Sequence, residues 1–325
     1  MAVYTEVSDE ALAEFLTAYD VGELSSLKGI AEGVENSNYL IGTDRQGRHS
    51  QFILTLYEKR VDPADLPFFL GLMDHLAERG LPCPVPVKDK TGAALQTLCG
   101  KPAAMVSFLD GVSVRRPQAD HCYGLGAAMA DMHRAGMDFP MRRPNSLSLA
   151  GWQSLAAETE PRADEVETGL SALVHAEIEA LSAHWPADLP AGVIHADLFP
   201  DNVFFRGTVL TGLIDFYFAC TDQLAYDLAI ALNAWCFEPD LSFNVTKANH
   251  LIEGYRSHRD LSAAEIEALP LLARGAALRF LLTRLHDWFE TPDGALVQKK
   301  DPMEYVKKLR FHQGVASAGA YGITR

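Results

Sequence analysis

Three side chains in the second half of the chain have types and spacings that suit catalysis. His195-Ala196-Asp197 is followed by Asn202, five positions after the aspartate, and Asp215 lies thirteen positions beyond Asn202. A carboxylate can orient an acceptor hydroxyl and accept its proton, while an amide oxygen and a second carboxylate can hold a metal against a triphosphate. The pattern predicts phosphoryl transfer from MgATP, with Asp197 at the acceptor and with Asn202 and Asp215 on Mg²⁺. The alternative, a surface loop of turn-forming residues, is disfavoured by the apolar strand-like residues at both ends.

The elements expected before residue 108 form a small antiparallel sheet with one main helix. Ser8 can cap a short first helix, and the main amphipathic helix covers 66–79, ending at Gly80. Gly- and Asp-containing turns separate extended apolar segments. The strands are expected at 24–29, 38–43, 51–57, between the turns at 90–92 and 99–101, and at 103–106.

After Asp110-Gly111 long helical periodicity dominates. Two short strands, 203–205 and 209–214, interrupt it and flank the hairpin between Asn202 and Asp215. We therefore predict an α+β fold with a β-rich N-lobe, residues 1–107, and a mostly helical C-lobe, residues 108–325. The helices are expected at about 117–137, 166–184, 225–236, 243–258, 263–289 and 303–312.

Composition narrows the possible partners. The 325 residues carry a net charge of −15, so a nucleic-acid binder, which needs a basic face, is disfavoured, as is binding to an anionic membrane. The N-terminus lacks a basic signal-peptide region. The five cysteines show no C-x-x-C spacing, which disfavours a disulfide scaffold and a structural zinc site. We expect a cytoplasmic protein that acts on a small molecule, without nucleic-acid or membrane partners.

The segment around Asp197 resembles the catalytic loop of the aminoglycoside phosphotransferase and choline kinase superfamily, relatives of the protein kinases. Residues 29–39 resemble its nucleotide-binding loop, 106–111 its adenine-contacting hinge, and 226–229 the start of the helix behind the catalytic loop. The resemblance implies a two-lobed protein-kinase-like fold. It also implies nucleotide contacts from Gly33, Asn36, Ser37, Asn38, Ser107 and Leu109.

The same resemblance gives Asp227 the role of a structural brace for the catalytic loop, although an acid at a helix N-terminus is also favoured by the helix dipole alone. His195 is expected to order this loop and is counted with Asp197 in the catalytic group. Gly33 and its neighbours are weak signals alone, because glycines also shape ordinary hairpins.

Within the superfamily, 32–39, 52–60 and 66–86 are most similar to homoserine kinases of the phosphotransferase type. That similarity implies conversion of L-homoserine to O-phospho-L-homoserine in threonine biosynthesis. One departure concerns the usual strand lysine and helix glutamate, whose positions hold Thr55 and Phe68. Loss of that pair raises the alternative that the chain is an inactive ATP-binding module. The presence of Asp197, Asn202 and Asp215 argues against this alternative. Lys59 or Arg60 is a candidate replacement for the missing lysine. The alternative is that both residues are simply charged side chains at the solvated end of a strand.

Homoserine carries a carboxylate and an ammonium group, for which an arginine and an acid are natural partners. Arg284 and Asp287 lie three positions apart and share a helix face. They either bind the amino-acid group of the acceptor or pair with each other as a structural salt bridge. The alternative acceptors are an aminoglycoside or a choline-like amino alcohol.

Overall fold

The extended apolar segments of the N-terminal third pair into an antiparallel sheet, and the later helical segments pack together separately. The computed structural model describes residues 4–30, 36–58, 61–291 and 299–323. The chain divides into two units, of which the first runs to Asp110 and also contains Gly212–Tyr217. The second contains Gly111–Thr211 and the chain from Phe218 onward. The return of Gly212–Tyr217 to the first unit has no counterpart in the sequence prediction.

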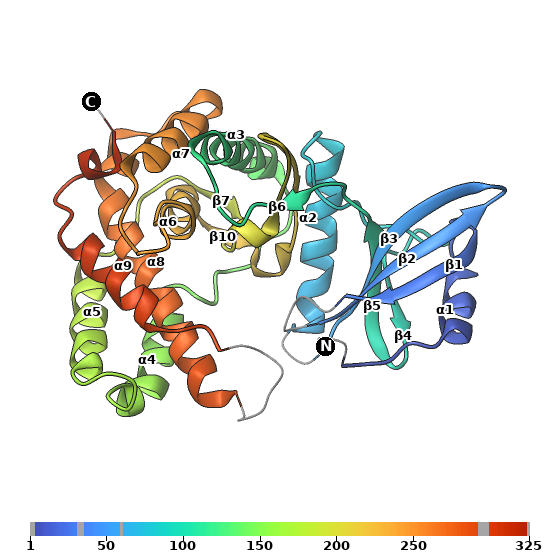
Figure 1. Ribbon diagram of the computed structural model, residues 1–325, viewed down its shortest axis with the longest axis horizontal. Coiled ribbons are helices and arrows are strands. Elements are labelled where there is room, and N and C mark those ends of the chain that lie inside the picture. The colour runs from blue at the N-terminus through green and yellow to red at the C-terminus, as the bar shows by residue number, and fades with distance from the viewer. Residues whose placement is uncertain (1–3, 31–35, 59–60, 292–298, 324–325) are drawn as a thin grey trace. The chain divides into compact units, whose positions relative to one another are not determined.

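The first unit is built on a five-stranded sheet in the order β1-β2-β3-β5-β4, with antiparallel neighbours (Figure 1). Asn38 on the second strand lies opposite Thr55 on the third. The predicted strands of this region are confirmed, with boundaries shifted by a few residues. They are β1 (Glu23–Gly29), β2 (Ser37–Arg45), β3 (Arg48–Leu56), β4 (Leu95–Leu98) and β5 (Lys101–Ser107).

Two helices accompany this sheet. In α1 (Asp9–Leu16), the Ser8 side chain accepts a hydrogen bond from the Ala11 N–H at 3.2 Å, which is the predicted cap. The apolar side of α1 packs in one buried cluster with residues of the sheet. The main helix, α2 (Leu66–Glu78), follows a short 3₁₀ turn, η1 (Pro63–Asp65), and lies within the predicted range.

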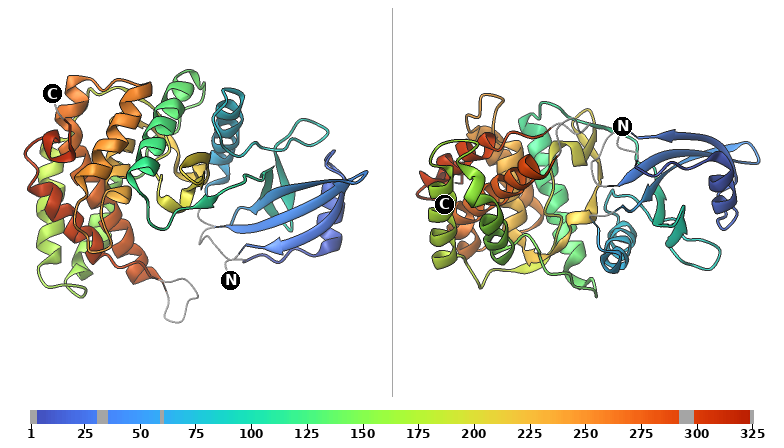
Figure 2. Two further views of the ribbon diagram at one scale, coloured as in Figure 1. Left: turned by 45° about the horizontal axis from the view of Figure 1, so that its top comes forward. Right: turned by 90° about the horizontal axis from the view of Figure 1, so that it is seen from below.

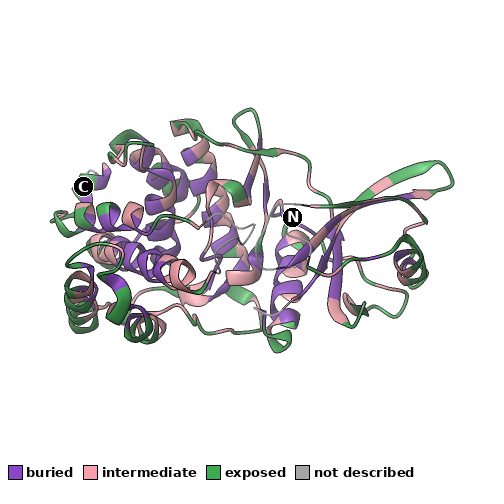
Figure 3. Ribbon diagram, turned by 60° about the horizontal axis from the view of Figure 1, so that its bottom comes forward, coloured by how far each residue is buried: buried purple, intermediate pink, exposed green. Residues whose placement is uncertain are grey.

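The second unit is mostly helical, as predicted. Its longest helix, α8, packs against α4, α5, α6 and α9 (Figure 2). Most residues of α6 are buried. Figure 3 colours the buried residues of the chain purple. The helices are α3 (Ala119–Ala135), α4 (Leu149–Ala163), α5 (Leu170–His184), α6 (Leu224–Trp235), α7 (Val245–His258), α8 (Ala263–Glu290) and α9 (Met303–Gln313), with 3₁₀ turns η2 (Gly136–Asp138) and η5 (Ala318–Tyr321).

Short strands frame the segment that carries Asp197. β7 leads into it and pairs antiparallel with β10, while β8 leaves it and pairs with β6. β9 follows β8 and continues into the part of the chain that belongs to the first unit. The strands are β6 (Val112–Ser113), β7 (Ala191–Ile194), β8 (Val203–Arg206), β9 (Val209–Leu213) and β10 (Cys220–Gln223), and the turns are η3 (Pro200–Asn202) and η4 (Phe216–Phe218).

Helices α3 and α7 approach each other backbone to backbone through two glycines. A Cβ at Gly126 of α3 would lie 2.0 Å from the carbonyl oxygen of Leu251, and one at Gly254 of α7 would lie 2.1 Å from that of Tyr123. Such distances are far below van der Waals contact, so only glycine permits this packing.

Within the residues that the structure describes, we find no helix with the length and apolar character needed to cross a membrane.

Candidate active site

The loop between β7 and β8 brings Asp197 and Asn202 together. The Asn202 side-chain amide donates to the Asp197 backbone carbonyl at 2.8 Å and to the Asp197 carboxylate at 3.1 Å. The η3 turn supplies the bend that makes this possible, with the Asn202 N–H donating to the Phe199 carbonyl at 3.0 Å. Asp197 is partly exposed, so its carboxylate is held in position and still accessible. Because the amide nitrogen of Asn202 faces Asp197, its Oδ1 is the atom available as a hard oxygen ligand.

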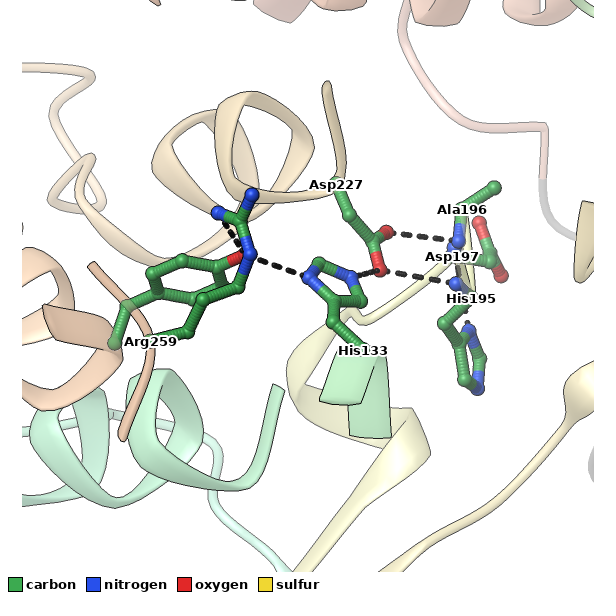
Figure 4. Close-up of polar contacts among 7 residues, drawn as sticks. His133, His195, Ala196, Asp197, Asp227 and Arg259 are labelled. Carbon is green, nitrogen blue, oxygen red and sulfur yellow. Dashed lines mark hydrogen bonds and ion pairs between the residues drawn. The ribbon is translucent and has the colours of Figure 1, made fainter. Parts of the chain in front are cut away.

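Asp227, at the start of α6, lies fully buried behind this loop (Figure 4). Its carboxylate accepts from the backbone N–H groups of His195 at 2.9 Å and Ala196 at 2.8 Å. It also accepts from His133 Nε2 at 3.0 Å. These are the contacts that a structural brace of the loop requires.

Burial by itself would raise the pKa of Asp227, because it penalises the charged carboxylate. The hydrogen bond from His133, the electrostatic interaction with the His133 and His195 side chains and the hydrogen bond from the His195 N–H outweigh that effect and leave the pKa below its ordinary value. Asp227 is therefore an ionised acceptor, which strengthens the bonds that hold the loop.

A hydrogen-bonded chain extends from Asp227 to Arg259 and Glu265. The His133 ring contacts the Tyr255 hydroxyl through Nδ1 at 2.8 Å, and that hydroxyl accepts from Arg259 at 3.1 Å. Tyr255 has one hydroxyl hydrogen, which it then gives to Nδ1, so the ring donates from Nε2 to Asp227. Arg259 in turn pairs with Glu265 at 2.9 Å. His133 therefore orients Asp227 through this hydrogen-bonded chain.

The carbonyl groups of the loop are also bound. Arg279 of α8 donates to the Ala196 carbonyl, and Trp235 Nε1 donates to the Leu198 carbonyl at 2.7 Å. Neither contact was predicted from sequence, because both partners come from distant helices. The loop around Asp197 is thus fixed through its backbone on both its N–H and its carbonyl groups.

Asp215 belongs to the first unit and is exposed. It lies two positions after the end of β9 and has a φ of 64°, in the left-handed region where residues other than glycine are uncommon. Its charge acts on neighbouring tyrosines: burial raises the pKa of Tyr217 to about 12, and the Asp215 carboxylate adds to that increase. Such conformations concentrate at functional positions.

The predicted phosphate-binding side chains of Asn36, just before β2, and of Ser37 and Asn38, at its start, have partners inside the first unit. The buried Ser37 hydroxyl donates to Glu58 at 2.8 Å, and Asn36 accepts from the Glu58 N–H at 3.2 Å. Asn38 accepts from the Thr55 hydroxyl at 2.8 Å. Their nucleotide-binding role stays a prediction, and it would have to use groups other than these engaged side-chain atoms.

At the predicted hinge, the Ser107 hydroxyl accepts from the Val85 N–H at 2.9 Å at the end of β5. Leu109 packs against Gly212, where an added Cβ would lie 2.8 Å from Leu109 Cδ1. Gly33 and the alternatives Lys59 and Arg60 lie outside the described residues.

Arg284 lies near the end of α8 with its charge already paired. Its Nη1 contacts Glu304 at 2.6 Å and the Asp301 carbonyl at 2.8 Å, and its guanidinium lies 4.5 Å from the centre of the Tyr305 ring. Asp287 is partly exposed on the same helix. The Glu304 pairing favours a structural role for Arg284 over binding of an acceptor carboxylate.

Among the described residues, no group of three or more His, Cys, Asp or Glu side chains gathers to form a metal cluster.

Comparison with known proteins adds independent information. The family model described as "Phosphotransferase enzyme family" matches residues 26–261. The chain is 61% identical to a homoserine kinase of Rhizobium rhizogenes (strain K84), covering 99% of each chain, and 62% identical to one of Xanthobacter autotrophicus (strain Py2), again covering 99% of each. Among solved structures, the amicoumacin kinase hAmiN superposes with a TM-score of 0.70 at 14% identity, covering 96% of this chain and 95% of that one. The likeness to hAmiN concerns the fold alone.

Proposed function

Because the chain belongs to the phosphotransferase enzyme family, we propose that it transfers the γ-phosphoryl group of ATP to the side-chain hydroxyl of L-homoserine. The observation that carries the proposal is the identity of about three residues in five with homoserine kinases over the whole chain. The product is O-phospho-L-homoserine, the intermediate expected for threonine biosynthesis.

The loop geometry supports Asp197 as the group that receives the acceptor hydroxyl. The hydroxyl oxygen forms a bond to the γ-phosphorus, the bond from that phosphorus to the β,γ-bridging oxygen breaks, and ADP departs. The hydroxyl proton passes to the Asp197 carboxylate, which Asn202 orients through the bond at 3.1 Å.

We assign Asn202 and Asp215 as the residues that hold Mg²⁺, on the basis of their oxygen donors. The metal, when bound, neutralises charge on the phosphates and orients them. Nucleotide contacts by Gly33, Asn36, Ser37, Asn38, Ser107 and Leu109 remain part of this proposal.

The test measures ADP release by the purified protein with MgATP and a panel of homoserine, choline, 3-aminopropanol and kanamycin. We expect a clear preference for homoserine. The Asp197→Asn variant should keep its melting temperature and lose about 10²- to 10⁴-fold in kcat, the usual contribution of a positioned base. The exposed neighbour Asp201 provides the control variant Asp201→Asn, which keeps wild-type stability. Preference for another acceptor would contradict the assignment of homoserine as the substrate. Near-normal turnover by Asp197→Asn would contradict the role of Asp197 as the base.

A further inference from the structure

The residue before Asp197 has an unfavourable backbone conformation. Ala196 is buried and has a φ of 63°, in the left-handed region that a Cβ makes costly. Such a conformation persists only where the surrounding structure fixes it. The direction of the Asp197 side chain depends on it, because the two residues share a peptide group.

The peptide groups on both sides of Ala196 are bound by charged side chains of opposite sign. Its N–H donates to Asp227 Oδ1 at 2.8 Å, and its carbonyl accepts from Arg279 Nη1. Asp227 comes from the start of α6 and Arg279 from the middle of α8. A rotation of the chain at Ala196 would break at least one of these bonds, so the pair acts on the residue from both ends.

Arg279 is buried, with 2% of its surface exposed. In the part of the chain that the structure describes, no carboxylate lies within ion-pair distance of it. Its guanidinium instead lies 4.5 Å from the centre of the Phe280 ring and 5.8 Å from that of Phe218, contacts that partly compensate a buried cation. An unpaired buried charge is costly, and its directed contact with the loop is the carbonyl of Ala196.

We propose that Arg279 is a positioning residue that holds Ala196 in its left-handed conformation and thereby aims the Asp197 carboxylate. This inference rests on the proposed function, because the reaction that Arg279 serves is phosphoryl transfer from ATP to L-homoserine. Asp227 binds the N–H of Ala196 and Arg279 binds its carbonyl, and we call this pair of side chains the clamp. The role differs from substrate binding, because the guanidinium acts through the backbone and leaves the acceptor to other groups.

The kinetic test uses Arg279→Met, which keeps much of the volume and removes the donor. We expect kcat to fall about 10- to 100-fold, the loss of one charged hydrogen bond, with KM for homoserine and ATP within about threefold. Arg279→Lys keeps a donor and should recover part of kcat. The control is Arg274→Met, on the same helix α8, which breaks the 2.6 Å ion pair between Arg274 and Glu177 of α5. It should lower the melting temperature and leave kcat unchanged.

The decisive variant adds Ala196→Gly to Arg279→Met, with Ala196→Gly alone as the reference in a double-mutant cycle. Glycine adopts positive φ freely, so it should restore kcat about tenfold in the Arg279→Met background. Simple additivity of the two changes would overturn the clamp. A large rise in KM for homoserine with unchanged kcat would instead make Arg279 a substrate-binding residue.

Amide hydrogen exchange gives a readout that does not depend on turnover. Exchange in the 191–202 segment should increase in Arg279→Met and stay at the wild-type level in Arg274→Met. If the wild type fails to phosphorylate homoserine while this pattern appears, the proposed function fails and the clamp stands. Unchanged exchange in Arg279→Met overturns the clamp whatever the substrate.

Discussion

Replacement of Asp227 by asparagine tests how the catalytic loop is held. The wild-type carboxylate is fully buried and accepts three hydrogen bonds, from His195 N at 2.9 Å, Ala196 N at 2.8 Å and His133 Nε2 at 3.0 Å. An asparagine has one acceptor oxygen and one amino group. In either orientation, at least one of the three donors must therefore face another donor.

The less costly orientation keeps the oxygen toward His195 and His133 and turns the amino group toward Ala196. Losing that bond, and leaving two buried donors opposed, costs about 1.5–3 kcal/mol, and the remaining bonds lose the help of the negative charge. We expect unfolding to become easier by about 2–4 kcal/mol, which lowers the melting temperature by about 5–10 °C in a unit of this size. Because the loop loses an anchor, kcat should fall by at least about tenfold.

Calorimetry and steady-state kinetics measure both effects, with the exposed Asp188→Asn as the charge-matched control. The pKa of Asp227 in the folded protein lies below the ordinary 3.8. Its stabilisation is therefore present above pH 3.8 and is lost as the pH falls through the lower folded value. The difference in the free energy of unfolding between the wild type and Asp227→Asn should be constant from pH 5 to about 8 and should decrease only in stronger acid. An Asp227→Asn protein that melts and turns over like the wild type would refute this account.

Three further predictions concern other parts of the second unit. Gly126→Ala should lower the melting temperature measured by calorimetry by several degrees, because the new Cβ would lie 2.0 Å from the Leu251 carbonyl oxygen. The control Gly124→Ala, whose Cβ would have its nearest contact at 3.7 Å, should be neutral or slightly stabilising. Burial, together with the charge of a neighbouring lysine, lowers the pKa of His312 to about 3, so stability should rise with pH between about 3 and 6.5 by up to about 1.4 kcal/mol per pH unit from this group. In a series of thermal melts, His312→Gln should remove that slope, and an unchanged slope would exclude His312 as its source. Arg284→Ala should lower the melting temperature and change KM for homoserine less than about threefold; a steep rise in KM would return Arg284 to the acceptor site.

The local parts of the fold were accessible from sequence, because periodicity and caps act over a few residues. Ser8, Gly80 and the apolar spacing of α2 define elements that the structure confirms. Helix α4 was missed because it contains Pro161, which normally ends a helix, and because its buried face is partly made of small residues. The strand β10 was missed because its sequence, Cys-Thr-Asp-Gln, carries no apolar alternation and gains its partner only from β7.

The site shows the same division. Asp197 and Asn202 are five positions apart in one loop, so their spacing already limits how far they can separate. Arg279 contacts Ala196 across 83 positions, and no local pattern encodes that pairing. Ser37 and Asn36 look like surface loop residues in sequence, yet their buried bonds to Glu58 depend on how the sheet closes.

The glycine pair between α3 and α7 also restricts how this enzyme can evolve. A clash at one core position is usually relieved by a smaller residue opposite, but the groups facing Gly126 and Gly254 are main-chain carbonyls, which no mutation can shrink. Every single-nucleotide change at a glycine codon that alters the amino acid adds a side chain or stops translation. The two positions therefore have no neutral intermediates and no compensating partners. Among functional homologues that keep this helix packing, we expect both glycines to be invariant, while the helix surfaces around them diverge freely.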